Sequence, residues 1–88
     1  MASKMTSSPI VSTEDVEGTP VYDLHGRKVG KVDHLKIEKA SGRVVFAVIN
    51  LAGFFGIGHS HREVPWNALI YSKKLHGYQL TTADVVSG

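Results

Sequence analysis

Two histidines on either side of a single serine, His59 and His61, are the residues whose types and spacing best suit a metal ion. Side chains two positions apart on a β-strand project from the same face, so both imidazoles could bind one divalent cation. Two ligands do not complete a site, because metal sites in proteins use three or four. Further ligands would have to be brought in by folding from His25, Asp23, His34 or Glu63. We therefore keep His59 and His61 as candidate ligands and predict no resident metal or other cofactor.

A second group of chemically interesting residues is basic. The segment 27–43 contains six Lys or Arg residues and two acidic ones, whereas 5–26 contains four acidic residues and no Lys or Arg. Arg27, Lys28 and Lys31 form a basic patch that could contact RNA phosphates or an acidic protein. Lysines of this kind also protect edge strands from aggregation, and the segment has no aromatic residue to stack on bases. We therefore do not expect nucleic acid among the partners.

No pattern in the chain predicts an enzyme. There is no Ser/His/Asp arrangement near a glycine elbow and no pair of carboxylates placed for acid–base catalysis. The glycine-rich stretch 53–58 lacks the Lys-Ser/Thr ending of a phosphate loop. Its aromatic residues, Phe54 and Phe55, either close one end of the fold or form an exposed contact patch.

Length and composition indicate one small domain. Residues 1–13 are rich in Ser and Thr and predict a disordered lead, 14–82 form the domain, and 83–88 are a short tail. A core of this size only marginally offsets chain entropy, so support from a partner chain is expected. Cysteine is absent, the N-terminus has no apolar stretch of the length that a signal peptide needs, and no later segment could span a bilayer. We therefore expect a cytoplasmic protein without membrane insertion.

The elements that position these residues are predicted to be strands. Residues 43–52 are apolar except for Arg43 and a single asparagine, and they are rich in β-branched side chains, which indicates a central strand. Residues 29–38 form the strand before it, joined through a hairpin loop closed by Gly42. Their apolar positions fit no single alternating register, which predicts a β-bulge near Asp33 and His34. A helix is the competing interpretation of 29–38, but the apolar spacing fits a helical period poorly and a glycine lies inside.

The remaining elements are short. Residues 16–23 are β-biased and contain a proline, which places them at a strand start or a sheet edge, and a turn follows at 24–27. Residues 66–69 follow a proline and predict a single helical turn. The segments 69–71 and 78–81 then pair as a closing hairpin.

The order and type of these motifs resemble the PRC-barrel domain family, over residues 16–82. The motifs are a glycine turn, V-G-x-V at 29–32, G-x-V-x-x-A-V at 42–48, G-F-F-G-I-G at 53–58 and V-P-W at 64–66. The family includes the cytoplasmic part of the photosynthetic reaction centre H subunit and the barrel of the ribosome maturation factors. The resemblance implies an all-β fold, a small, mostly antiparallel β-barrel of five to six strands with one short helical turn near Trp66. It also implies a protein-binding or self-associating module without shared catalytic residues.

The central strand has two apolar faces, and a closed barrel buries only one of them. We predict that Phe46, with Val44 and Val48, points inward, and that the opposite face forms a homodimer interface with the loop aromatics and Trp66. Trp66 could instead cap the core. The predicted interface residues are Val45, Ala47, Ile49, Leu51, Phe54, Phe55 and Trp66. The expected function is a stand-alone, non-enzymatic scaffold that binds itself and an unidentified protein; the alternative is a ribosome- or RNA-associated accessory protein using the basic hairpin 27–43.

Overall fold

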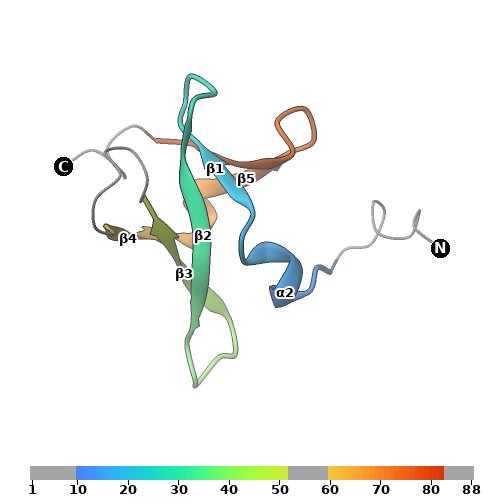
Figure 1. The fold of residues 1–88 in the computed structure, drawn as a ribbon. Helices are drawn as coiled ribbons and strands as arrows, with labels where there is room; N and C mark the ends of the chain where they lie inside the picture. The colour runs from blue at the N-terminus through green and yellow to red at the C-terminus, as the bar shows by residue number, and fades with distance from the viewer. Residues whose placement is uncertain (1–9, 52–59, 83–88) are drawn as a thin grey trace.

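Strands dominate the structure, a computed structural model that describes residues 10–51 and 60–82. Six strands form one sheet in the order β4-β3-β2-β1-β6-β5 (Figure 1). The strands are β1 (Pro20–Tyr22), β2 (Lys28–Ile37), β3 (Val44–Asn50), β4 (His61–Pro65), β5 (Leu69–Ser72) and β6 (Gly77–Leu80). A short helix, α2 (Thr13–Val16), precedes them, and the 3-10 turn η1 (Trp66–Ala68) joins β4 to β5. The predicted all-β fold and the helical turn at Trp66 are confirmed.

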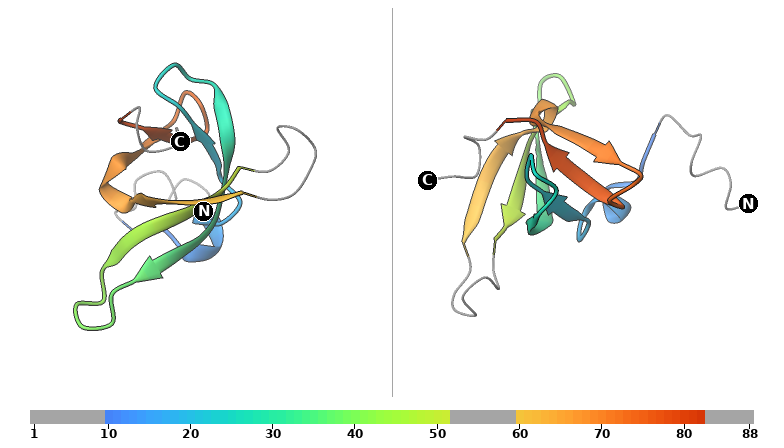
Figure 2. Two further views of the ribbon diagram at one scale, coloured as in Figure 1. Left: turned by 90° about the vertical axis from the view of Figure 1, so that its left-hand side faces the viewer. Right: turned by 90° about the horizontal axis from the view of Figure 1, so that it is seen from above.

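The sheet curls into a half-barrel with β4 and β5 as its two edge strands (Figure 2). All neighbouring strands pair antiparallel except β1 and β6, which run parallel. The predicted strand at 16–23 is shorter than expected, because Pro20 begins β1 and Val16 ends α2. Ser12 starts this helix, since its side chain accepts a hydrogen bond from the backbone N–H of Glu14.

The bulge predicted near Asp33 and His34 is confirmed. Val32 pairs with Ile49 and His34 pairs with Val48, which leaves Asp33 as the extra residue on β2. Val32 is buried, whereas Asp33 and His34 are both exposed, so the bulge keeps two successive polar side chains out of the core.

Two glycines explain the close approach and the turn at either end of the β2–β3 pair. A Cβ atom on Gly30 would overlap the backbone carbonyl oxygen of Asn50 on β3, so only glycine fits this position. Gly42 has a φ of 76°, the left-handed conformation predicted for closing the loop. Its N–H donates a 2.8 Å hydrogen bond to the carbonyl oxygen of Glu38.

The core lies inside the curve of the sheet, and it reverses the predicted faces of β3. Ala47 and Ile49 are fully buried, whereas Phe46 is 38% exposed. The prediction that Phe46 points inward and that Ala47 and Ile49 point outward is therefore wrong. Which face of β3 is buried follows from the residues that lie opposite it on the neighbouring strands. Ile49 opposes Val32, and Ala47 lies between Leu35 and Val64, whereas Phe46 lies between Lys36 and Pro65.

Helix α2 closes one side of this core. Val16 is only 2% exposed and belongs to the same buried cluster as the strand residues. The other buried members are Val21, Val32, Ala47, Ile49, Val64, Leu69, Tyr78 and Leu80. The Val16 side chain therefore attaches the N-terminal segment to the sheet, together with the 2.8 Å hydrogen bond from the Gly18 N–H to the Val32 carbonyl oxygen.

Candidate functional site

The outer face of β2, β3 and β4 carries most of the side chains that could do chemistry. Strand register places His34, Val48 and Glu63 in one row across this face. An open hollow of about 440 Å³ lies here. Its lining residues are Asp33, His34, Lys36, Val48, His61 and Glu63. The sequence offered His34 and Glu63 only as further metal ligands that folding would have to bring in, because their neighbourhood depends on pairing between strands far apart in the chain.

The bulged Asp33 is the centre of the polar contacts in this hollow. The His34 Nδ1–H donates to the Asp33 carboxylate over 2.6 Å, and His61 Nε2 lies 3.9 Å from the other carboxylate oxygen. The hydrogen bond from His34, aided by the charges of both imidazoles and opposed by partial desolvation, lowers the pKa of Asp33 below its ordinary value. Folding therefore places His61 close to the carboxylate of Asp33. His59, its predicted partner, lies outside the described residues.

The charged groups of the hollow are paired with one another. Lys36 Nζ forms an ion pair with Glu63, so most polar groups of the lining already contact one another. Among the described residues that line the hollow, none carries a hydroxyl or thiol that could act as a nucleophile. Within 10–51 and 60–82, no group of three or more His, Asp or Glu side chains is arranged to hold a metal ion.

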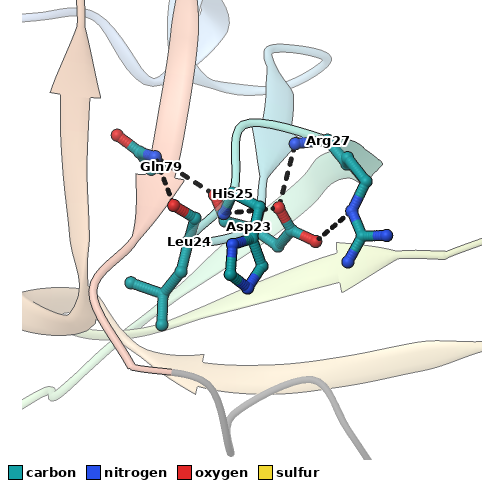
Figure 3. A network of polar contacts seen from close by, with 5 residues as sticks. All are labelled: Asp23, Leu24, His25, Arg27 and Gln79. Atoms are coloured by element: carbon teal, nitrogen blue, oxygen red, sulfur yellow. Dashed lines mark hydrogen bonds and ion pairs between the residues drawn. The ribbon is translucent and has the colours of Figure 1, made fainter.

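The three residues of the predicted basic patch have different roles, because Arg27 belongs to a turn. The Asp23 carboxylate accepts hydrogen bonds from the backbone N–H groups of His25 and Arg27, each over 2.9 Å, and forms a 3.2 Å ion pair with Arg27 Nε (Figure 3). The Gln79 side chain on β6 donates to the carbonyl oxygens of Asp23 and Leu24. Arg27 is therefore part of the turn, while Lys28 and Lys31 lie exposed on β2.

These contacts also set the acidity of Asp23. The hydrogen bond from the Arg27 backbone is the largest influence and lowers the pKa of the carboxyl. The His25 backbone and the Arg27 guanidinium act in the same direction, and partial desolvation opposes them. The turn therefore favours the ionised form of Asp23.

The predicted interface residues are distributed differently from expectation. Ala47 and Ile49 are buried in the chain's own core, and Leu51 is partly buried against it. Phe54 and Phe55 lie outside the described residues. Among the members of this set that the structure describes, only Val45 is exposed, at 38%.

Trp66 belongs to an aromatic cluster at the end of the sheet. Its ring centroid lies 5.6 Å from that of Tyr78, which in turn lies 5.4 Å from the ring of Tyr71 in an edge-on arrangement. Trp66 is partly buried and packs against the core. This position favours the core-cap interpretation of Trp66. Burial, aided by the nearby Tyr71, raises the pKa of the Tyr78 hydroxyl.

The distal half of the β2–β3 hairpin exposes apolar side chains on a projecting part of the sheet. In Figure 1 this hairpin extends past the other strands. Ile37 is 53% exposed, and Val45 and Phe46 are each 38% exposed. Phe46 pairs with Lys36 on the outer face, whereas Ile37, the next residue of β2, points to the opposite face, so the exposed apolar side chains line both faces of this projection. We call Ile37, Val45 and Phe46 the hairpin surface.

Comparison with known proteins agrees with this architecture. Among curated proteins, no sequence matches the chain. No helix in the described segments is long and apolar enough to cross a membrane. A family model described as the PRC-barrel domain matches residues 10–85, which include the half-barrel and its helix. This match covers most of the 88 residues and confirms the resemblance seen in the motifs: the chain belongs to the PRC-barrel domain family.

Proposed function

We propose that this chain is a non-enzymatic protein-interaction module that forms a homodimer through the hairpin surface. The observation that carries the proposal is the joint exposure of Ile37, Val45 and Phe46 on a projecting hairpin. Burying one large apolar side chain stabilises a contact by about 1.5–3 kcal/mol. A two-fold axis repeats every contact, because the same surface of each copy takes part.

The polar hollow supports the non-enzymatic part of the proposal. Its charged groups are paired with one another, and no hydroxyl or thiol nucleophile lies among the described residues of its lining. A catalytic site usually keeps such groups poised for a substrate. The hollow lies on the same outer face as Phe46, so it could border the contact with a partner.

The RNA-associated alternative receives less support from the geometry. Arg27 and Lys36, two of the basic residues in the hairpin 27–43, form ion pairs with Asp23 and Glu63. Their charge is thereby partly neutralised for phosphate binding. We also propose a cytoplasmic location, since a chain without cysteine has no need of an oxidising compartment.

Sedimentation velocity tests the proposed dimer. Wild-type protein at high micromolar concentration should sediment at twice its chain mass of 9.6 kDa. Ile37→Ser with Phe46→Ser should weaken association by roughly tenfold or more, because every 1.4 kcal/mol changes affinity about tenfold. Ile70→Ser is a matched control, since Ile70 is 59% exposed on the distant strand β5. A wild-type monomer, or equal weakening by the control, would remove the hairpin surface from the proposal.

A further inference from the structure

The hairpin surface is bordered by exposed cations. Lys39 and Arg43 lie in the loop that ends the hairpin, and both side chains are exposed. Among the described residues, the ion pairs on this hairpin join Lys36 to Glu63 and Asp33 to histidines, and none includes Lys39 or Arg43. An occupant of this surface should therefore combine apolar side chains with negative charge.

The N-terminal segment of the same chain has those properties. Val11 is 58% exposed, and Glu14, Asp15 and Glu17 are exposed on and beside α2. No Lys or Arg occurs from residue 5 to residue 26. None of the ion pairs in the described part of the chain involves these three carboxylates.

The N-terminal segment is also held in place against the rest of the chain. Val16 is buried in the core, and the Thr19 hydroxyl donates a 2.7 Å hydrogen bond to the carbonyl oxygen of Asp15. Figure 1 shows α2 and the end of the β2–β3 hairpin toward the same end of the molecule. A two-fold axis at that end could place each helix beside the hairpin of the other copy.

We infer that the N-terminal segment 10–17 of a second copy occupies the hairpin surface, with Glu14 and Glu17 facing the partner's Lys39 and Arg43. This inference rests on the proposed homodimer and names its two faces. The contact is reciprocal, because each copy supplies one acidic segment and one basic hairpin. Since the charges lie at the rim of the contact, its affinity should fall as salt increases.

Charge reversal on each face tests the assignment. One variant carries Glu14→Lys and Glu17→Lys, and the other carries Lys39→Glu and Arg43→Glu. Each alone should associate at least tenfold more weakly than wild type at low salt, because like charges then meet. An equimolar mixture should regain the wild-type affinity as a heterodimer, since opposite charges meet at both contacts. Native mass spectrometry distinguishes this heterodimer by its mass.

Two further variants keep the test decisive. Lys73→Glu with Lys74→Glu reverses the same amount of charge at exposed positions in the β5–β6 turn and should leave association unchanged. All four reversals in one chain should restore a homodimer, and circular dichroism should show each variant folded. If wild type is a dimer but the reversals have no effect, or the mixture stays monomeric, the assignment is overturned and the proposed homodimer stands. A wild-type monomer overturns both.

Discussion

The two connections that flank strand β2 are held in different ways. The turn before it is attached to a distant strand, because the Gln79 side chain of β6 bonds the carbonyl oxygens of Asp23 and Leu24 (Figure 3). The loop after it is held by local bonds. The Glu38 N–H donates to the Arg43 carbonyl over 2.8 Å, and the Ser41 hydroxyl donates to the Glu38 carboxylate over 2.6 Å.

This difference separates basic residues that the sequence places together. Arg27 is an integral part of its turn, because both its backbone and its guanidinium bond Asp23. Arg43 contributes to its loop through its backbone, but the side chains of Lys39 and Arg43 form no ion pair among the described residues and remain exposed. One connection stabilises the fold, and we propose that the other serves association.

Strand β3 offers the largest contrast to test. Ile49→Ala should lower the free energy of unfolding by about 2–5 kcal/mol, because it leaves a cavity in the core. Phe46→Ala should lower it by about 1 kcal/mol or less, since that side chain is partly exposed. Urea unfolding of dilute protein measures both values. Similar losses for the two variants would contradict the observed orientation of β3.

A smaller effect is expected at the turn 23–27, which the Gln79 side chain joins to β6. Asp23→Asn keeps an acceptor for the two backbone N–H groups but removes the charge that pairs with Arg27. Because folding lowers the pKa of Asp23 below 3.8, its ionised form stabilises the fold above that pH. This stabilisation is lost as pH falls through the lowered folded-state pKa.

Thermal melting across pH measures this contribution. The melting temperature of the variant should lie below that of wild type near neutral pH, and the two should converge in strong acid. Asp33 also has a lowered pKa, so Asp33→Asn provides a comparison at the bulge. A constant difference between wild type and Asp23→Asn at all pH values would exclude the charge as the source.

The smallest effect concerns RNA. Replacing Arg27, Lys28 and Lys31 by Ala should change RNA binding little, because binding is expected to be weak in the wild type. Fluorescence anisotropy with a labelled single-stranded RNA at physiological salt tests this expectation. Submicromolar binding that the triple variant abolishes would instead favour the RNA-associated function.

Features set by local chain chemistry could be predicted from the sequence. The bulge at Asp33 follows from a break in apolar alternation, and the left-handed Gly42 follows from the length of its loop. The turn at Trp66 follows from the proline before it. Each depends on a few adjacent residues, so no tertiary information was needed.

Features set by the register between strands far apart in the chain could not be predicted from the sequence. The size of Phe46 favoured burial, but its cross-strand neighbours are Lys36 and Pro65, whereas Ala47 has Leu35 and Val64. The sequence does not reveal these pairings, so it could not show which of the two side chains is buried. The approach of His61 to Asp33 also depends on β4 pairing with β3, which no spacing in the chain reveals.

The most direct test of the proposed contact is the concentration dependence of the backbone amide NMR shifts of wild-type protein. On dilution from high to low micromolar concentration, the amides of 37–46 should shift most, with those of 10–17 if the reciprocal assignment is correct. The amide chemical shifts of the turn 23–27 should remain constant. Shifts concentrated instead around the aromatic cluster of Trp66, Tyr71 and Tyr78, or no shift anywhere, would contradict the assignment of the hairpin surface as the site of association.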